Sequence, residues 1–435
     1  MKPVNVGLLG LGTVGGGTVN VLRRNAHEIT RRAGRGIRVS CAAARDRPRD
    51  CNVEGIRFSR DPYSVVDDPD VQIVVELIGG VELARELILR AIANGRHVVT
   101  ANKALIARHG NELFAAARAR GVMVAFEAAV AGGIPIIKAI REGLAGNRIE
   151  WLAGIINGTC NYMLSAMREE GREFDEALAE AQRLGYAEAD PAFDVDGIDA
   201  AHKLTILASI AFGIPLQFDR LHVEGIRYIT RTDVVYAEEL GYRIKHLGFA
   251  RATAQGIELR VHPTLIPHRR LIANVDGVMN AVLVNGDAVG PTLYYGAGAG
   301  AEPTASAVVA DLVDVVRVLT SDPENRVPHL AFQPDALADT PILPMEAVET
   351  AYYLRLQALD QPGVLADVTR ILGERGISIE AMVQKEPAEG QDDVSVILLT
   401  HRVREGQMND AIQHIERLQS VTAPVTRIRV EGLGR

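Results

Sequence analysis

One short segment of the chain gathers five carboxylates just ahead of a lysine, and such a group of residues could take part in proton transfer. The residues are Glu188, Asp190, Asp194, Asp196 and Asp199, followed by Lys203. The run after Lys203 has almost no polar face, which predicts a buried helix that begins with Asp199 and Lys203 one turn apart. Partial desolvation would lower the pKa of Lys203 and make it a candidate proton donor and acceptor. An ordinary helix start explains the same residues, with Asp196 as the cap and Lys203 as the ion-pair partner of Asp199.

The amino terminus carries a glycine pattern that is typical of dinucleotide binding. Residues 4–9 read as a buried parallel strand, and the sequence Gly10-Leu-Gly12-Thr-Val-Gly15 follows directly before a helical pattern that reaches about Arg24. These residues match the dinucleotide-binding fingerprint GxGxxG, and they lie where that motif must lie, in the turn between a strand and a helix. Gly10 permits the tight turn, Gly12 lets backbone N–H groups approach a pyrophosphate, and Gly15 lets the helix pack closely on the strand.

The end of the second strand bears on the choice of nicotinamide cofactor. The strand that begins at Ile37 ends at Arg45 and Asp46. An arginine at this position can pair with a 2′-phosphate, whereas an acidic residue would hold a ribose 2′-OH. The sequence therefore favours NADP and leaves NAD possible.

The positions of further strands bring another lysine into the candidate site. Strand patterns over 71–78 and 97–100 alternate with a helical pattern over 82–94, and the second strand ends in Ala101-Asn-Lys103. Ligands bind at the carboxyl ends of strands in open parallel sheets, so Lys103 is expected near a nucleotide or a substrate. The alternative is an ordinary lysine at a helix start.

Composition and charge exclude several classes of protein. The chain has 435 residues, 47% of them hydrophobic, which is enough for two or three domains, and its net charge of −8 makes nucleic acid an unexpected partner. Its three cysteines and eleven histidines form no CxxC or HExxH motif, so neither a disulfide framework nor a zinc site is expected. Because we find no leader and no apolar run of about 18 residues, we expect no membrane span and a cytoplasmic location.

The rest of the chain reads as two further parts. Residues 216–290 contain strand patterns that suggest an antiparallel or mixed sheet, one face of which a second subunit could cover. Three alternating glycines end at Gly300 before an apolar helix, and they suit either a second backbone cradle or a flexible turn. Five prolines mark residues 322–349 as a linker. Beyond it, residues 352–430 show the order βαββαβ of a ferredoxin-like unit, which we expect to be a separable regulatory module.

These motifs together resemble a known family. The first 320 or so residues resemble homoserine dehydrogenase, and residues 352–430 resemble an ACT regulatory domain. The motifs that carry the resemblance are 10–15 (GLGTVG), 101–103 (ANK), 157–161 (NGTCN), 185–191 (GYAEADP), 196–203 (DGIDAAHK), 296–300 (GAGAG) and, for the ACT domain, 360–365 (DQPGVL). No aspartokinase-like segment precedes them, which indicates a monofunctional form.

The resemblance implies an α/β fold in three domains. A Rossmann-type doubly wound parallel sheet is expected over 1–130, completed by helix 303–320. A mixed α+β catalytic and dimerisation domain is expected over 131–302, and a ferredoxin-like ACT domain over 350–432. The implied assembly is a homo-oligomer, either a dimer or a tetramer.

The resemblance also implies a reaction and the residues that perform it. Homoserine dehydrogenases interconvert L-aspartate 4-semialdehyde and L-homoserine by hydride transfer with NAD(P)(H), in the pathway to threonine and methionine. Because an oxygen gains negative charge as hydride arrives, a cationic acid beside it is useful. Lys203 is implied as that acid and Lys103 as a second cation. The implied substrate-binding residues are Glu188, Asp199, Asp194 and Thr159, and Glu188 suits the substrate ammonium group. The implied cofactor-binding residues are Gly10, Gly12, Thr13, Val14, Gly15, Arg45, Lys103 and Gly300.

Two further sites follow from the resemblance. A monovalent cation such as Na⁺ is implied at Glu127, Val130, Gly132 and Ile134, an oxygen-only set that suits a hard ion. Glu127 could equally be a simple carboxylate at a strand end. An amino-acid effector, most simply L-threonine, is implied at Asp360, Gly363, Val364 and Leu365.

Two other functions remain compatible with the sequence. The first is a non-catalytic sensor of nucleotide and amino acid, and the second is a dehydrogenase of another small amino acid. The carboxylates and two lysines in plausible pocket positions argue against the sensor.

Overall fold

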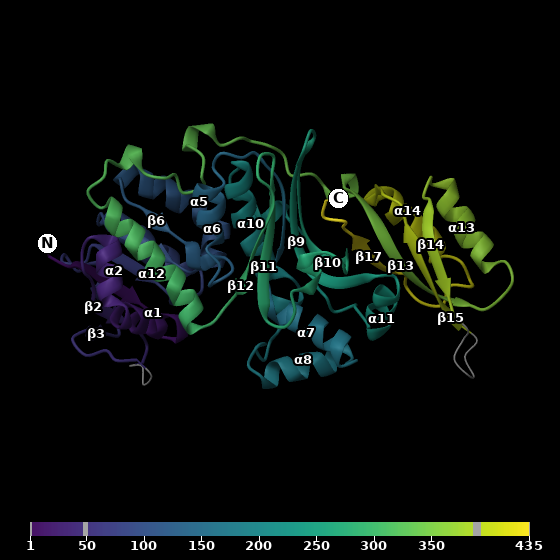
Figure 1. Cartoon of the computed structure of the whole chain (residues 1–435), viewed down its shortest axis with the longest axis horizontal. Coiled ribbons are helices and arrows are strands. Elements are labelled where there is room, and N and C mark those ends of the chain that lie inside the picture. The colour runs from purple at the N-terminus through teal and green to yellow at the C-terminus, as the bar shows by residue number, and fades with distance from the viewer. Residues whose placement is uncertain (1, 47–50, 386–392, 435) are drawn as a thin grey trace. The chain divides into compact units, whose positions relative to one another are not determined.

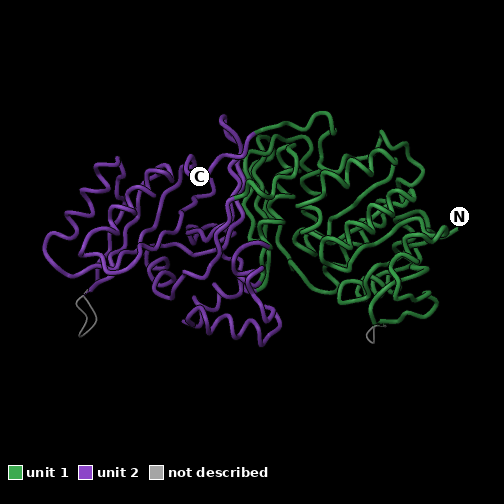
Figure 2. The backbone as a smooth tube through the Cα atoms, turned by 180° about the vertical axis from the view of Figure 1, so that it is seen from behind, with its two compact units in different colours: residues 1–158, 199–221, 278–340 green, residues 159–198, 222–277, 341–435 purple. Residues whose placement is uncertain are grey.

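The computed structural model describes residues 2–46, 51–385 and 393–434. The chain divides into two compact units (Figure 2). The first unit holds residues 1–158, 199–221 and 278–340, and the second holds residues 159–198, 222–277 and 341–435. Among the described residues, no helix is long and apolar enough to cross a membrane.

The amino-terminal sheet is parallel throughout, with the strand order β3-β2-β1-β4-β5-β6. Its two edge strands, β3 and β6, are labelled in Figure 1. Its strands are β1 (Val4–Leu9), β2 (Ile37–Ala43), β3 (Arg57–Ser59), β4 (Ile73–Glu76), β5 (His97–Thr100) and β6 (Val124–Ala125). The order reverses between β1 and β4, which creates the switch point at which doubly wound sheets bind nucleotides. The predicted Rossmann-type sheet is confirmed.

Helices flank this sheet and bury its apolar residues. They are α1 (Thr13–Arg24), α2 (Ala26–Ala33), α3 (Tyr63–Val66), α4 (Glu82–Ala93), α5 (Lys103–Arg120) and α12 (Ala301–Val318). Helix α12 comes from much later in the chain, yet it packs on α1 and contributes its apolar face to the same core as β1. That packing agrees with the expected completion of the nucleotide-binding part by a late helix.

The first unit also contains three antiparallel strands and the helix that bears Lys203. The remaining elements of this unit are β7 (Ile149–Ile155), β11 (Met279–Gly286), β12 (Gly290–Ala297), α6 (Ile136–Lys138), α10 (Ile198–Phe212) and the short turns η1 (Glu127–Ala129), η2 (Ala139–Gly143), η3 (Phe218–Arg220), η5 (Pro323–Asn325) and η6 (Pro334–Ala336). Strand β11 pairs with both β7 and β12. Residues 199–211 of α10 are all buried, as their apolar sequence predicts.

The second unit is built on a mixed sheet with the order β9-β10-β17-β13-β15-β14. Its strands are β8 (His222–Val223), β9 (Tyr242–Thr253), β10 (Gly256–Pro267), β13 (Glu349–Leu359), β14 (Ile379–Gln384), β15 (Asp393–Thr400), β16 (Val403–Arg404) and β17 (Thr426–Val430). Its helices and turns are α7 (Gly158–Glu169), α8 (Phe174–Arg183), α9 (Ala192–Val195), α11 (Arg231–Glu239), α13 (Val364–Glu374), α14 (Glu405–Ile415), η4 (Leu271–Asn274) and η7 (Met345–Ala347). The order β13, α13, β14, β15, α14, β17 matches the expected βαββαβ unit.

The carboxyl-terminal segment, which the linker prolines suggest to be separable, shares its sheet with earlier parts of the chain. Strand β17 is antiparallel to β13 but also parallel to β10, so the βαββαβ sheet continues into the β9–β10 hairpin. Within the predicted linker, the Pro341 carbonyl accepts the Ile257 N–H at 2.9 Å, and the Leu343 N–H donates to the Ile257 carbonyl at 2.8 Å. These pairings argue against a separable module. They join residues far apart in sequence, for which local patterns carry no signal.

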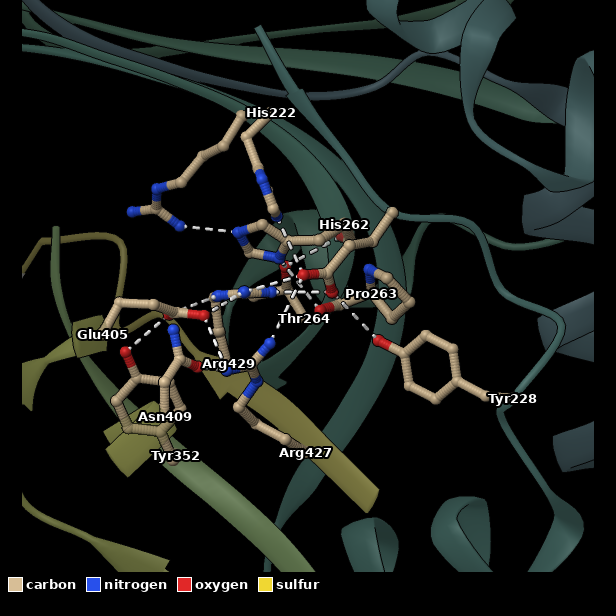
Figure 3. Close-up of polar contacts among 12 residues, drawn as sticks. His222, Tyr228, His262, Pro263, Thr264, Tyr352, Glu405, Asn409, Arg427 and Arg429 are labelled. Atoms are coloured by element: carbon tan, nitrogen blue, oxygen red, sulfur yellow. Dashed lines mark hydrogen bonds and ion pairs between the residues drawn. The ribbon is translucent and has the colours of Figure 1, made fainter. Parts of the chain in front are cut away.

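Buried ion pairs reinforce this junction (Figure 3). Arg429 on β17 is fully buried, and its guanidinium donates to Glu224 at 2.8 and 2.9 Å and to Glu405. The Tyr352 hydroxyl donates to Glu405 at 2.7 Å. Buried charges are stable only when they are paired and hydrogen-bonded, so this cluster makes the C-terminal strand part of the core of its unit.

Candidate active site

Two lysines meet one buried carboxylate in the first unit. Lys203 Nζ lies 2.7 Å from Asp199 Oδ2, and Lys103 Nζ lies 2.6 Å from Asp199 Oδ1. Helix α10 places Asp199 and Lys203 one turn apart, and helix α5 begins at Lys103 after strand β5. The structure therefore brings together three of the predicted site residues, and the contact of Lys103 with Asp199 adds to the helix pair that the sequence indicates.

The charges of this cluster support one another. Asp199 is only 3% exposed, and burial alone would raise the pKa of its carboxyl group. The positive charges and hydrogen bonds of Lys203 and Lys103 outweigh burial, so the pKa of Asp199 lies well below its usual range. The neighbouring His202 has its pKa lowered to about 4, chiefly by burial, and is neutral at physiological pH. Asp199 thus remains an anion that holds two ammonium groups.

The end of strand β7 completes the surroundings of Lys203. Lys203 Nζ donates to the Ile156 carbonyl at 2.7 Å, and the Asn157 side-chain amide donates to Asp199 Oδ2 at 2.8 Å. Asn157 belongs to the motif over 157–161, but no functional role follows for it from the sequence alone. The one feature of the sequence that could have pointed to Asn157 is an amide side chain that opens this motif just after a strand.

The other predicted substrate-binding residues lie in the second unit. The Thr159 hydroxyl is 2.6 Å from the Tyr186 carbonyl and 3.3 Å from Asp194 Oδ2. Glu188 is exposed, and its carbonyl accepts a hydrogen bond from the side chain of Gln182 at 3.0 Å. Asp196, the possible helix cap, forms an ion pair with Arg227. The acidic segment is therefore held by local contacts of its own.

The amino-terminal turn has the shape that a pyrophosphate needs. Gly10 has φ +97°, and a Cβ there would lie 2.6 Å from the Leu77 carbonyl oxygen. A Cβ on Gly15 would overlap the Gly10 carbonyl, whereas a Cβ on Gly12 would meet no atom within 4 Å. No side chain caps α1, whose first residues Thr13 and Val14 are exposed and half-buried. Open space beside uncapped N–H groups fits a dinucleotide phosphate.

The remaining predicted cofactor residues lie at the edges of this region. Arg45 is exposed just after β2, and Gly300 precedes helix α12 with φ +123°. Helix α12 lies against α1, where a Cβ on Gly17 would lie 2.6 Å from the Ala301 carbonyl oxygen. The glycine turn that ends at Gly300 therefore leads into a helix that packs on α1, the helix that follows the glycine fingerprint.

Glu127 is a buried carboxylate with a structural partner for each oxygen. Its Oε1 and Oε2 accept the N–H groups of Ile137 and Lys138, each at 2.9 Å, and its own N–H donates to Asp311 at 2.8 Å. Burial, then the charge of Asp311, raise the pKa of Glu127 to about 7. Val130, Gly132 and Ile134 lie in the buried loop between Glu127 and α6. These hydrogen bonds explain the carboxylate as a cap for α6 without any cation.

The four predicted effector residues line one cavity of about 320 Å³. Gly363 has φ +96° and precedes helix α13, for which no side-chain cap is found among the described residues. Gln384 donates to Asp360 Oδ1 at 3.3 Å, and Val394 and Val396 add apolar surface. The cavity thus presents a carboxylate, a helix N-terminus and an apolar floor.

Comparison with known proteins decides the family. The model of homoserine dehydrogenase matches residues 135–313, that of the homoserine dehydrogenase NAD binding domain matches residues 10–127, and that of the ACT domain matches residues 352–419. The homoserine dehydrogenase of Pseudomonas aeruginosa is 70% identical over 433 residues, covering 100% of both chains. The chain belongs to the homoserine dehydrogenase family. That of Bacillus subtilis is 38% identical over 438 residues, again covering both chains fully.

Solved homoserine dehydrogenases share the fold. The crystal structure from Thiobacillus denitrificans superposes with a TM-score of 0.95 at 70% identity and covers 100% of this chain and 99% of its own. A hyperthermophilic archaeal homoserine dehydrogenase in complex with NADPH has a TM-score of 0.61 at 27% identity, covering 72% of this chain and 98% of its own.

Membership of the homoserine dehydrogenase family makes the chain an oxidoreductase with a nicotinamide-dinucleotide-binding domain and an ACT domain. The assignment argues against the non-catalytic sensor. The lysine cluster is suited to the chemistry of such an enzyme because an ammonium group can donate a proton to an oxygen that becomes an anion, and a neutral lysine can accept one. Each ammonium is held by Asp199 at hydrogen-bond distance.

Proposed function

We propose that the chain interconverts L-homoserine and L-aspartate 4-semialdehyde, with NADP favoured as the cofactor. The observation that carries this proposal is the pair of lysines on the two oxygens of Asp199. Such a cluster would offer two cations to a carbonyl or hydroxyl oxygen whose charge changes in the reaction. The pathway to threonine and methionine follows as part of the same proposal.

Lys203 is proposed as the acid and base of the reaction. In the oxidation of homoserine, neutral Lys203 accepts the proton of the hydroxyl group, and in the reverse direction its ammonium returns a proton to the oxygen. The bound nicotinamide cofactor supplies the hydride chemistry. Lys103 provides a second positive charge near the reacting oxygen, and Asp199 fixes both side chains. The burial of Asp199 and Lys203 excludes most water from the cluster.

Glu188, Asp194 and Thr159 are proposed to bind the amino-acid portion of the substrate. A carboxylate is the natural partner of an α-ammonium group, and Glu188 is exposed and therefore accessible to one. The contact of Thr159 with Asp194 supports a shared role for these two side chains.

The nucleotide-binding residues are proposed to be Gly10, Gly12, Thr13, Val14, Gly15, Arg45, Lys103 and Gly300. The open space at Gly12 and the uncapped start of α1 support the phosphate position. The preference for NADP is supported by the exposed guanidinium of Arg45 at the end of β2 and by the NADPH bound to the archaeal relative.

Regulation by an amino acid is proposed for the ACT domain. The cavity at Asp360, Gly363, Val364 and Leu365 would receive an α-carboxylate at the start of α13 and an ammonium group at Asp360. L-Threonine is the proposed effector because it is an end product of the proposed pathway, and its binding would lower activity. A homo-oligomer, a dimer or a tetramer, is proposed as the working assembly.

Two further proposals concern a bound cation and the location of the protein in the cell. A monovalent cation such as Na⁺ at Glu127, Val130, Gly132 and Ile134 is kept as a proposal, although hydrogen bonds already occupy the Glu127 carboxylate. A cytoplasmic location is likewise proposed, as expected of a biosynthetic enzyme.

One assay tests the proposed reaction. Purified full-length protein is mixed with L-homoserine and either NADP⁺ or NAD⁺, and reduced cofactor is followed by its absorbance. We expect turnover with L-homoserine, faster with NADP⁺ at subsaturating cofactor. If L-homoserine gives no turnover while L-serine or another small amino acid does, the alternative of a different dehydrogenase holds.

A further inference from the structure

Two consecutive residues at the end of strand β7 contact both members of the Lys203 and Asp199 pair. The Ile156 carbonyl accepts from Lys203 Nζ at 2.7 Å, and the Asn157 amide donates to Asp199 Oδ2 at 2.8 Å. Asn157 is 3% exposed, so its hydrogen bond is shielded from water. The two residues that follow strand β7 therefore fix the lysine through a backbone carbonyl and the carboxylate through a side chain.

The two oxygens of Asp199 have different partners. Oδ1 forms an ion pair with Lys103, whereas Oδ2 accepts hydrogen bonds from both Lys203 and Asn157. A carboxylate with partners on both oxygens has a fixed plane, because rotation about its C–C bond would break at least one of these contacts. The amide of Asn157 is the neutral donor among the three, so it can fix that plane without adding charge.

We propose that Asn157 is a positioning residue for proton transfer, holding the Asp199 carboxylate so that one oxygen faces Lys203 and the other faces Lys103. This inference deepens the proposed function, since it rests on the proposed role of Lys203. By donating to Oδ2, Asn157 also weakens the attraction of that oxygen for the Lys203 ammonium. Loss of the amide would strengthen the ion pair and make Lys203 harder to deprotonate.

The groups that could alter this balance are few in the described part of the first unit. Helix α10 contributes Asp199, His202 and Lys203, and helix α5 contributes Lys103 and Arg108. His202 has its pKa lowered to about 4, chiefly by burial, so it stays neutral above pH 6. A change in the pH dependence of an Asn157 variant above pH 6 would therefore report on Lys203 and its partners.

The test compares Asn157→Leu, which keeps the approximate side-chain volume but removes the donor, with the isosteric Asn157→Asp. The measurements are kcat/KM for homoserine from pH 6 to 10.5 at saturating cofactor, kcat, cofactor Kd and thermal unfolding. We expect Asn157→Leu to lower kcat about 10- to 100-fold, the loss typical when a supporting hydrogen bond to a site is removed. In the plot of kcat/KM against pH, the rise that reports deprotonation of Lys203 (the rising limb) should move to higher pH. The Kd for the cofactor should be unchanged.

Asn157→Asp should move the rising limb at least as far, because a second carboxylate beside Lys203 favours its charged form. This variant keeps the test decisive if Asn157→Leu does not fold. Asn285→Leu is the control, since Asn285 in the same unit hydrogen-bonds an exposed carboxylate of Glu150. The positioning role would be overturned if kcat were unchanged, or if kcat/KM rose over the same pH range as in the wild type. Full activity of Lys203→Ala would instead overturn the proposed role of Lys203 itself.

Discussion

Lys103 and Lys203 bind different oxygens of the same carboxylate, although one begins helix α5 and the other lies in the first turns of α10. The distances are 2.6 and 2.7 Å, so Asp199 fixes the spacing of the two ammonium groups. Neither lysine can move far without losing an ion pair that is largely buried. Within the first unit, this relationship ties helix α10 to the start of helix α5, which follows strand β5.

The first prediction concerns the choice of cofactor. Arg45→Ala should weaken NADPH binding roughly 10- to 100-fold, because a hydrogen bond to a charged group contributes about 1.5 to 3 kcal/mol. NADH, which lacks the 2′-phosphate, should bind nearly as well as to the wild type. Fluorescence titration of both reduced cofactors measures the two Kd values.

Arg38→Ala is the matched control for Arg45. Arg38 lies on β2 and is exposed like Arg45, but its side chain donates to Asn5 at 2.9 Å. This variant should leave both Kd values unchanged. Equal losses of NADPH and NADH affinity in Arg45→Ala would remove Arg45 from the ribose site.

The second prediction concerns the buried ion pairs of the second unit. Arg429→Met should lower the free energy of unfolding by about 3 to 5 kcal/mol, since it removes the fully buried cation that binds both Glu224 and Glu405 and leaves them the partly exposed Arg427. Arg404→Met, which removes an exposed pair with Glu349, should change it by less than about 1 kcal/mol. Chemical unfolding of both variants gives these values. A chain that ends near Pro344 should be unstable for the same reason, and a fully stable Arg429→Met protein would refute this account of the junction.

Local patterns were sufficient for much of the fold but not for its long-range contacts. The strand, turn and helix around the glycine fingerprint, the buried helix after Asp199 and the βαββαβ order all depend on patterns within short segments, and the structure confirms these elements. The pairing of β17 with β10 depends on residues that are distant in the chain, and nothing in the linker sequence reveals it. The contact of Lys103 with Asp199 is of the same kind.

The role of Asn157 could not be predicted from the sequence for a different reason. It lies within a motif that identifies the family, yet its role depends on the direction of a side chain at the end of β7. Its hydrogen bond to Asp199 Oδ2 distinguishes it from Asn161 in the same motif, whose amide donates instead to the Val275 and Gly277 carbonyls.

The third prediction concerns pH and the buried pair of Glu127 and Asp311. Burial, then Asp311, raise the pKa of Glu127 to about 7, and burial is the main cause that raises the pKa of Asp311 to about 6. Between the ordinary values and these raised values, the folded chain holds more protons than the unfolded chain. The free energy of unfolding should therefore fall as the pH rises from about 5 to 7.

Asp311→Asn tests this assignment, because its amide oxygen can still accept the N–H of Glu127. Its unfolding free energy should fall less steeply over the same pH range in buffer free of sodium and potassium. Equal slopes for variant and wild type would show that the pair does not control the pH dependence. A rise in melting temperature with NaCl but not with choline chloride would support the proposed cation.

The fourth prediction concerns the effector cavity. L-Threonine should bind the full-length protein in calorimetry and lower its rate, with a coupling of about 1 to 3 kcal/mol between the two sites. Asp360→Ala should weaken threonine binding about tenfold, as expected for the loss of one charge-assisted hydrogen bond. Asp367→Ala, an exposed carboxylate on α13 paired with Arg370, should bind threonine normally. Absence of both threonine binding and a rate change would refute threonine as the effector.

The most direct test of the account is the rate of homoserine oxidation by Lys203→Ala. The variant should fold and bind cofactor with the wild-type Kd, but its kcat should fall about 10²- to 10⁴-fold, the usual contribution of a positioned acid or base. Lys385→Ala, which removes an exposed lysine paired with Glu239, should keep the wild-type kcat. A wild-type kcat for Lys203→Ala would contradict the account and leave Lys203 as the ion-pair partner of a helix start.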